Sequence, residues 1–469
     1  MKKIFLIACC WLFVADSSAQ TVSQKLQKAF QQFESDSQLK HAISSLYVID
    51  AATGQVVFDK NSQVGLAPAS TQKIITSVTA FELLGKEYRY KTDFWLNKSS
   101  PNYSQLQFVE LKQVGDPTFG SNRFVSTTST EILKQFSQAC NRNGISAASL
   151  AILRFNNKFD VQKIPDGWIF QDIGNYYGAG SDGFNWKENQ SDIVLRAGKF
   201  EGDDVKVIHT DSSAGTGYID NRLKTGKPNS GDNAYYYFNY GNHDASYPVL
   251  RGTIPLGENE FKISIATANP FAHFVNELTK KGLISNAFSN ANNFDVSSIW
   301  EPTKADVNIY THYSPSLDSI IYWFLKKSIN LYGEALIKTF AYEKKGFGST
   351  DSGVAIVKKF WKDKGLDEDE LNIYDGSGLS PLNRITTHAQ VEVLKYAKGK
   401  NWFPYFYDAL PEYNGTKMKS GTISDVKGFC GYQKSKDGRE YIFSFLINNY
   451  SGKTSGVVNK MYKVLDELK

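Results

Sequence analysis

Cysteine and histidine are scarce in this sequence, and neither is arranged as a metal site needs. The 469 residues include four cysteines and six histidines. Cys9 and Cys10 lie in an N-terminal apolar segment, whereas Cys140 and Cys430 are far apart, so no metal-binding or redox spacing occurs. No H-E-x-x-H pattern is present. We therefore expect neither a catalytic metal nor a cofactor. Cys140 and Cys430 are expected to be two buried free thiols, with a disulfide as the alternative.

The sequence also lacks a strong excess of charge of one sign and, after its N-terminus, any long apolar run. Its 53 Lys and Arg residues nearly balance 48 Asp and Glu residues that are spread along the chain, which gives nucleic-acid binding little support. No later apolar run is long enough to cross a bilayer, so we expect no transmembrane anchor. A hydrophobic content of 41% supports packed cores, and the length predicts two or three domains.

The N-terminus has the order of a secretory signal peptide. Two lysines precede an apolar stretch over residues 4–15, and small residues at 17–19 offer a cleavage site. We predict that residues 1–19 are removed and that the protein is exported to the periplasm or cell envelope. The alternative is a lipoprotein anchored at Cys9. It is less favoured because the apolar run before Cys9 is short and continues beyond it.

Apolar periodicity divides the mature chain into three parts. Residues 45–58 read as a β-hairpin, and a helical pattern runs from Ser70 to Leu84 and stops at Gly85. Short apolar or alternating runs between turn residues then predict a strand-rich insertion of one or two domains over 88–300. We expect residues 20–87 and 301–469 to form the two halves of one domain around that insertion.

The C-terminal half combines helices with an antiparallel sheet. Helical periodicity covers 317–325 and 332–340, and three sequential strands are predicted at 417–423, 427–432 and 441–448. A final helix over 457–468 carries an apolar stripe that suits packing on this sheet, and peripheral contact with a membrane surface is the alternative. The fold class is therefore α+β, with an antiparallel sheet flanked by helices.

Ser70 and Lys73 are the strongest candidates for a nucleophile and its base. The pattern S-x-x-K also occurs at Ser37 and Ser424, but only Ser70 opens a strongly apolar helix directly after a proline-containing turn. Residues i and i+3 share a helix face, so Lys73 can reach the Ser70 hydroxyl. If burial or a neighbouring cation lowers the pKa of Lys73, it can accept the serine proton as a base. An ordinary capping serine with a solvated lysine is the alternative.

Two further motifs supply the remaining groups of an acyl-transfer site. Ser328 and Asn330 lie between two apolar helices, where a hydroxyl and an amide can relay protons and hold a substrate. Residues 419–422 are Lys-Ser-Gly-Thr on a predicted strand. There Lys419, Ser420 and Thr422 can bind a terminal carboxylate, and Gly421 allows a ligand to approach closely. If the strand lies at the sheet edge, the N–H groups of Ser70 and Thr422 can form an oxyanion hole.

The order S-x-x-K, S-x-N and K-[ST]-G resembles that of the penicillin-recognising serine enzymes. The long separation of Lys73 from Ser328 is similar to that of the penicillin-binding protein 4 type, the class C low-molecular-mass D-alanyl-D-alanine carboxypeptidase/endopeptidases. The short segments at 115–118, 177–180 and 375–380 also resemble those of this family. Ile329 replaces the commoner Asp of S-x-N, and Ser420 replaces Thr of K-T-G, but neither change removes a needed group.

This resemblance implies a β-lactamase/transpeptidase-like domain interrupted by additional domains. It also implies carboxypeptidase or endopeptidase activity on peptidoglycan stem peptides through a Ser70 acyl-enzyme, with β-lactam antibiotics as covalent inhibitors. In this scheme Ser328 donates a proton to the leaving amine, Asn330 orients Lys73, and residues 419–422 bind the substrate carboxylate.

The sequence is also compatible with two other functions, those of a serine β-lactamase and of a non-catalytic relative. Residues 368–372 match the E-x-x-L-N of class A β-lactamases, although the charge run around them favours an acidic loop that leads into a strand. A non-catalytic cell-wall-binding relative is the second alternative. Residues 179–183 nearly match a hydrolase nucleophile elbow, but we expect a turn there because no strand-to-helix pattern surrounds them.

Overall fold

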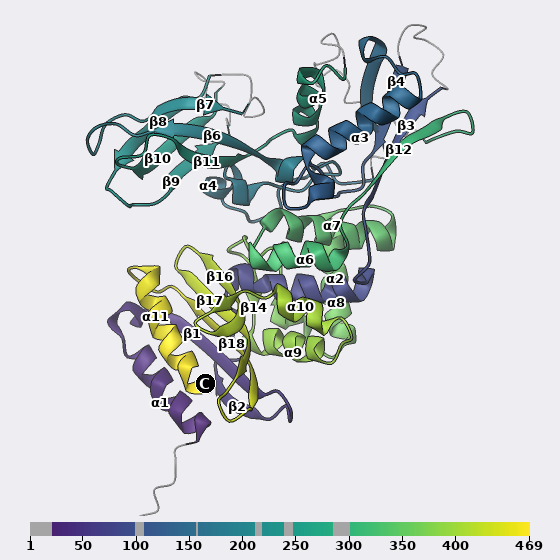
Figure 1. Ribbon diagram of the computed structural model, residues 1–469. Helices are drawn as coiled ribbons and strands as arrows, with labels where there is room; N and C mark the ends of the chain where they lie inside the picture. The colour runs from purple at the N-terminus through teal and green to yellow at the C-terminus, as the bar shows by residue number, and fades with distance from the viewer. Residues whose placement is uncertain (1–20, 99–106, 156–157, 212–217, 239–246, 285–300) are drawn as a thin grey trace, which may run out of the picture.

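The computed structural model describes residues 21–98, 107–155, 158–211, 218–238, 247–284 and 301–469. These residues form a helix-and-sheet domain built from both ends of the chain, together with an insertion that lies above its helices in Figure 1. The predicted signal peptide and Cys9 lie outside the described residues.

A six-stranded sheet organises the domain formed by the chain ends, with every neighbouring pair antiparallel in the order β15-β16-β17-β18-β1-β2. The strands are β1 (Ile43–Asp50), β2 (Val56–Lys60), β15 (Glu412–Tyr413), β16 (Thr416–Ile423), β17 (Val426–Lys434) and β18 (Glu440–Asn448). The predicted hairpin and the three predicted C-terminal strands are confirmed. Strand β1 pairs with β18 along its whole length, which brings the two ends of the chain into one sheet.

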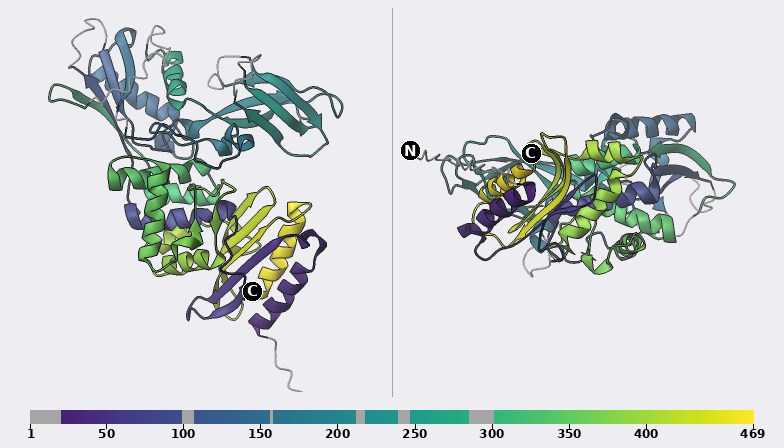
Figure 2. Two further views of the ribbon diagram at one scale, coloured as in Figure 1. Left: turned by 180° about the vertical axis from the view of Figure 1, so that it is seen from behind. Right: turned by 90° about the horizontal axis from the view of Figure 1, so that it is seen from below.

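Both faces of this sheet are covered by helices, because side chains along each strand alternate between the faces. From β1, Leu46 and Val48 pack in a core with α1 (Val22–Glu34) and α11 (Thr454–Leu465), whereas Tyr47 and Ile49 join the core of the other helices. Figure 2 shows α1 and α11 side by side on one face. Helix α11 buries its apolar stripe there, as expected for packing on the sheet.

The helical layer on the other face surrounds α2 (Lys73–Leu84), whose residues from Lys73 to Phe81 are all buried. Its neighbours are α6 (Leu317–Lys326), α7 (Asn330–Lys345), α8 (Thr350–Asp363) and α9 (Thr387–Lys398), and α10 (Phe403–Ala409) packs against α6 and α9. A helix that is apolar on nearly every side is stable only inside a core. The position of α2 therefore carries the lysine at its first residue into the interior.

The insertion contains two parts with separate cores. One part is a four-stranded sheet in the order β12-β3-β4-β5, and its core includes residues of α3 (Ser129–Arg142) and α5 (Pro270–Lys280). Its strands are β3 (Lys91–Asn97), β4 (Gln107–Lys112), β5 (Leu150–Phe155) and β12 (Val307–Tyr313). The other part has two three-stranded sheets that share one core. These hold β6 (Gln190–Arg196), β7 (Lys206–Thr210), β8 (Asp220–Gly226), β9 (Asn233–Tyr237), β10 (Val249–Pro255) and β11 (Phe261–Ala266).

The predicted end of the insertion at residue 300 is too early. Strand β12 pairs antiparallel with β3, so residues 307–313 complete a sheet of the insertion rather than belonging to the second half of the first domain. The chain enters the helical layer only at α6. Pairing between strands that are distant in the chain leaves no local signal in the sequence, which explains this error.

The two cysteines outside the N-terminal segment are free and buried, Cys140 on α3 and Cys430 on β17. They belong to different cores, so the prediction of free thiols is confirmed. Within the described ranges, no helix is long and apolar enough to cross a membrane.

Candidate active site

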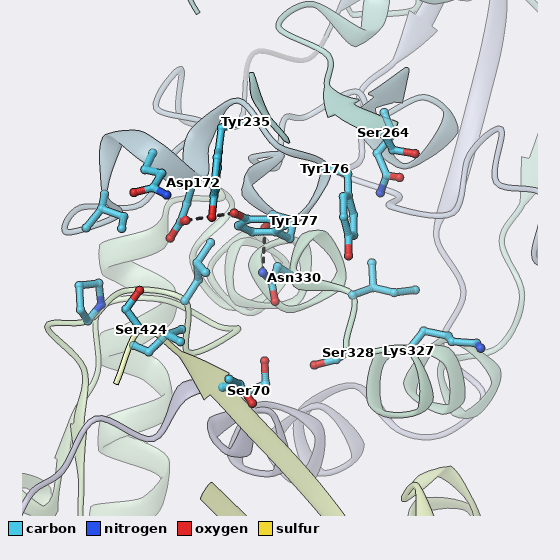
Figure 3. Close-up of a pocket in the computed structure, with 18 of the residues that line it drawn as sticks. Ser70, Asp172, Tyr176, Tyr177, Tyr235, Ser264, Lys327, Ser328, Asn330 and Ser424 are labelled. Carbon is cyan, nitrogen blue, oxygen red and sulfur yellow. Dashed lines mark hydrogen bonds between the residues drawn. The ribbon is translucent and has the colours of Figure 1, made fainter. Parts of the chain in front are cut away.

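Ser70 lies in a cavity of about 540 Å³ between the first domain and the insertion. Figure 3 shows Ser70 and Ser328 on one side of this space, Tyr176, Tyr177 and Asp172 on the other, and Asn330 between them, hydrogen-bonded to Tyr177. The first domain also contributes Thr422, and the β-rich part of the insertion contributes Tyr235 from β9 and Ser264 from β11. Both portions of the chain therefore form the walls of the cavity.

Ser70 sits in a strained turn. The regular helix α2 begins at Lys73, so Ser70 lies in the 3₁₀ turn Ala69–Gln72 before it rather than in the first α-helical turn. Ala69 has a φ of 47°, a left-handed conformation that is unfavourable for a residue with a side chain. The chain at Gly378 presses on this turn, because a Cβ atom there would lie 2.0 Å from the Ala69 carbonyl oxygen. Ser70 caps neither helical element, so the capping alternative is wrong.

Lys73 is held by acceptors from three separate segments. Its Nζ lies 2.9 Å from Ser70 Oγ, 2.7 Å from Asn330 Oδ1 and 2.7 Å from the carbonyl oxygen of Ser377. Its side chain is fully buried. Burial lowers the pKa of Lys73 to about 7, against the opposing influence of Asp375 and Glu334. A large fraction of Lys73 is therefore neutral near pH 7, and its nitrogen is within hydrogen-bonding distance of the Ser70 hydroxyl.

Ser328 and Lys419 form the second pair of the site. Lys419 Nζ lies 2.9 Å from Ser328 Oγ and 2.8 Å from the carbonyl oxygen of Ser420. Lys419 is 1% exposed, and burial together with the charge of Lys73 holds its pKa well below the ordinary value. Ser328 has a φ of 56°, a conformation that L-residues rarely adopt. The lysine thus supports Ser328 from inside the protein.

Asn330 connects the insertion to Lys73. Its amide Nδ2 donates to the carbonyl oxygen of Tyr177 at 2.7 Å, while Oδ1 accepts from Lys73. Because both ends of the amide are occupied, its orientation is fixed. From the sequence, the segment that contains Tyr177 stood out only by its resemblance to the family, and no role for Tyr177 was predicted.

The strand that carries Lys419 to Thr422 lies at the edge of the sheet where it meets the cavity. Strand β15 pairs only with Thr416 and Lys417, so among the described residues the following part of β16 is paired on one side, with β17. An extended peptide could pair with the free side. The hydroxyl groups of Ser420 and Thr422 both accept hydrogen bonds from Lys427.

Gly421 has a packing role that was not predicted from the sequence. A Cβ atom at this position would lie 2.6 Å from the carbonyl oxygen of Pro68 and 2.9 Å from the amide nitrogen of Ser70. Glycine is therefore required because β16 packs directly against the turn that holds Ser70. This contact places the backbone of residues 421–422 beside the Ser70 N–H.

Two buried acids near Lys73 were not identified from the sequence. The carboxylate of Asp375 accepts hydrogen bonds from five groups: Gln72 Nε2, Trp168 Nε1, Asn383 Nδ2 and the amides of Gly378 and Ser380. It therefore shapes the loop whose Ser377 carbonyl binds Lys73. Glu334 is fully buried on α7 and accepts from the Gly376 amide at 3.0 Å. Burial and the charge of Asp375 raise the pKa of Glu334.

The E-x-x-L-N match at 368–372 and the near match to a nucleophile elbow at 179–183 lie outside the arrangement around Ser70. Residues 368–372 form a 3₁₀ turn and a short strand, as expected, and Glu368 pairs with Lys362 at 2.8 Å. The described residues that line the cavity include none of these five. One acid of this charge run is not exposed to solvent: Glu370 is buried against Thr386 and His388. Residues 179–183 form a loop in which Ser181 is 1% exposed.

Comparison with known proteins gives consistent matches over most of the chain. The family described as D-Ala-D-Ala carboxypeptidase 3 (S13) matches residues 26–416. A D-alanyl-D-alanine carboxypeptidase of Actinomadura sp. is 25% identical over 472 residues, which cover 94% of this chain and 84% of that protein. The D-alanyl-D-alanine carboxypeptidase DacB of Haemophilus influenzae is 22% identical over 424 residues, covering 85% and 83% of the two chains.

The fold is shared with a solved structure. The crystal structure of penicillin binding protein 4 from Haemophilus influenzae matches with a TM-score of 0.75 and 17% identity, over 94% of this chain and 98% of that one. At this identity the likeness establishes the fold class, an α+β transpeptidase-like domain with additional strand-rich parts.

The pKa of Lys73 predicts how the reactivity of Ser70 depends on pH. Below pH 7 Lys73 holds its proton and cannot accept that of Ser70, so the rate of Ser70 acylation by penicillin should rise with pH through an apparent pKa near 7. Stopped-flow measurement over a pH series tests this. Lys73→Arg, which stays protonated, should be slower by roughly 100-fold or more. A rate independent of pH across this range would contradict the role of Lys73 as the base.

The packing of β16 on the Ser70 turn predicts a strong effect for Gly421→Ala. The added methyl group must push the strand from the turn, and a displacement of about 1 Å can reduce the rate by roughly 100-fold. Acylation by penicillin measures the loss. Gly399→Ala is the matched control, because the nearest atom to its new Cβ is 3.7 Å away, and its rate should equal that of the wild type. Equal rates in both variants would show that this contact does not position Ser70.

Proposed function

This chain belongs to the D-Ala-D-Ala carboxypeptidase 3 (S13) family, and on that premise we propose that Ser70 is its nucleophile and Lys73 its base. The chain is a serine-type D-Ala-D-Ala carboxypeptidase of the penicillin-binding protein 4 type that acts on peptidoglycan. The observation that carries the assignment of residues is the 2.9 Å contact between Lys73 Nζ and Ser70 Oγ within a buried site that lowers the pKa of Lys73.

Acylation begins when Lys73 takes the Ser70 proton. The serine oxygen then attacks the carbonyl carbon of a D-Ala-D-Xaa bond, and the carbonyl oxygen becomes an oxyanion. The N–H groups of Ser70 and Thr422 are the proposed donors to it, which is supported by the contact of Gly421 with the Ser70 amide. The positive end of helix α2 adds to this stabilisation.

Departure of the amine needs a proton, and Ser328 is the proposed donor. Its oxygen takes a replacement proton from Lys419, whose Nζ lies 2.9 Å from Ser328 Oγ. Lys419 donates to Ser328 Oγ, so the hydroxyl hydrogen of Ser328 is free to point into the cavity. Asn330 keeps Lys73 oriented towards Ser70 while the proton moves. Once the amine leaves, a water molecule attacks the acyl carbonyl carbon and passes a proton through Ser328 to Lys419. The bond to Ser70 Oγ then breaks, and Ser70 takes its proton back from Lys73.

The substrate carboxylate is assigned to the hydroxyl groups of Ser420 and Thr422. They lie on the part of β16 that follows its pairing with β15, where an extended stem peptide can add alongside the strand. Lys419 supports this region indirectly, because its described hydrogen bonds go to Ser328 and to the Ser420 carbonyl. β-Lactam antibiotics are proposed to acylate Ser70 in the same way. The β-lactamase alternative gains no support, since Glu368 forms no part of the cavity wall.

Export to the periplasm or cell envelope is the proposed location. The order of residues at the N-terminus supports it, as does a peptidoglycan substrate that lies outside the cytoplasm. Anchoring at Cys9 is the less favoured alternative.

Digestion of purified peptidoglycan tests the proposed activity. We expect the wild type to release D-Ala, to separate cross-linked stem peptides, or to do both, with products identified by mass. Ser70→Ala should reduce product formation by roughly 10⁴-fold or more, because the covalent route is lost. The masses of the products distinguish carboxypeptidase activity, which releases D-Ala, from endopeptidase activity, which separates cross-linked stem peptides.

Fluorescent penicillin supplies the control for this digestion. A long-lived label on the wild type that disappears in Ser70→Ala supports a D,D-peptidase, whereas rapid turnover of the penicillin favours a β-lactamase. A folded wild type with neither label nor products would identify a non-catalytic wall-binding relative.

The proposed export predicts the mature N-terminus. Cleavage after Ala19 leaves Gln20 as the first residue, so the intact mass of the protein recovered from its native envelope should correspond to residues 20–469. A lipid-modified chain that starts at Cys9 would identify the anchored alternative, and an uncleaved chain would contradict both.

A further inference from the structure

Lys427 is a cation behind the carboxylate-binding edge that the mechanism above does not use. It lies on β17 and is 6% exposed. Its Nζ is 2.7 Å from Ser420 Oγ and 2.8 Å from Thr422 Oγ1, and it lies over the ring of Phe429, 4.7 Å from the ring centroid. Burial lowers the pKa of Lys427 to about 8, which leaves most of it protonated at neutral pH.

The register of the sheet explains why two lysines serve opposite faces of one strand. Thr422 faces Lys427 and Ser420 faces Phe429 across the β16–β17 pair, and residues directly opposite in an antiparallel pair project to the same face. The alternate residues Lys419 and Gly421 therefore project to the other face, where they contact Ser328 and the Ser70 turn. Lys427 is thus separated from the acylation machinery by the strand itself.

The hydrogen bonds of Lys427 determine how the two hydroxyl groups are oriented. An ammonium group can only donate, so the oxygen atoms of Ser420 and Thr422 accept from it, and the hydrogen of each hydroxyl is left free for another acceptor. Thr422 is exposed and lines the cavity that contains Ser70. A carboxylate can only accept, so hydroxyl groups whose hydrogens remain available for donation, with a positive charge behind them, suit this group.

Lys419 does not supply an equivalent charge at this edge. It is 1% exposed, and its described hydrogen bonds go to Ser328 and to a backbone carbonyl. Lys427 instead binds the hydroxyl oxygens themselves. The cation best placed to act on a ligand held by these hydroxyls is therefore Lys427.

We propose that Lys427 is a specificity-determining positioning residue that orients the Ser420 and Thr422 hydroxyls and selects substrates whose leaving residue carries a free α-carboxylate. This inference rests on the proposed peptidase function. It assigns a residue outside the three family motifs to recognition of the substrate charge.

Two N-acylated peptides that end in D-Ala-D-Ala, one with a free carboxylate and one with a C-terminal carboxamide, test the proposal. In Lys427→Met, a neutral side chain of similar length, kcat/KM for the free acid should fall at least about tenfold, mainly through a higher KM. The value for the carboxamide should change by less than about threefold. Lys427→Arg retains the charge and should keep the preference for the carboxylate.

Lys434→Met is the matched control. It removes the same charge from an exposed position of the same strand, so both kinetic values should remain at the wild-type level. A double-mutant cycle with Thr422→Val adds a second readout. If Lys427 acts through the Thr422 hydroxyl, the two losses on the free acid are less than additive. Should Lys427→Met fail to fold, Lys427→Gln removes the charge while keeping hydrogen-bond donors and gives the same comparison.

Each outcome decides the question. Selective loss on the free acid supports the proposal, whereas equal losses on both peptides show a merely structural residue, and unchanged values exclude Lys427 from recognition. If the wild type cleaves both peptides equally well, the inference fails while the peptidase function stands. If it cleaves neither and Ser70 takes no penicillin label, the proposed function itself fails.

Discussion

The buried amine of Lys73 is the group on which the arrangement of the site depends. Its three hydrogen-bond partners come from the 3₁₀ turn before α2, the start of α7 and the loop at 375–380. A lysine buried without partners would be very unfavourable, so all three segments must be in place for the interior position to be tolerated. The same burial lowers the pKa of Lys73, and this is the property that its proposed role as a base requires.

The insertion contributes to this arrangement rather than only covering it. The carbonyl of Tyr177 fixes Asn330, and Glu188 accepts hydrogen bonds from Tyr332 on α7 and from Arg123. Residues 187–189 all have φ between 52° and 56°, a costly run of left-handed conformations that the surrounding contacts must hold. Since α7 begins at Asn330, these contacts join the insertion to the helix that orients Lys73.

The sequence by itself determined the main secondary structure and singled out the candidate reacting groups. The hairpin at 45–58, the apolar helix after Ser70 and the three C-terminal strands all have local apolar periodicity, which depends only on neighbouring residues. Ser70, Lys73, Ser328, Asn330 and Lys419 were recognisable because their motifs combine fixed spacing with a defined helix or strand context. The acidic residues Asp375 and Glu334 had no such spacing relative to Lys73, so their proximity could not be inferred.

Only the tertiary structure decided how these groups act on one another. It placed β12 in the sheet of the insertion, assigned Gly421 to the contact with the Ser70 turn, and turned Lys419 inward to Ser328. It also brought Lys427, part of a repeated and uninformative S-x-x-K match, behind the hydroxyls of Ser420 and Thr422. Strand pairing, burial and side-chain direction depend on segments that contact each other only in the folded chain. Local sequence patterns do not show which distant segments those are.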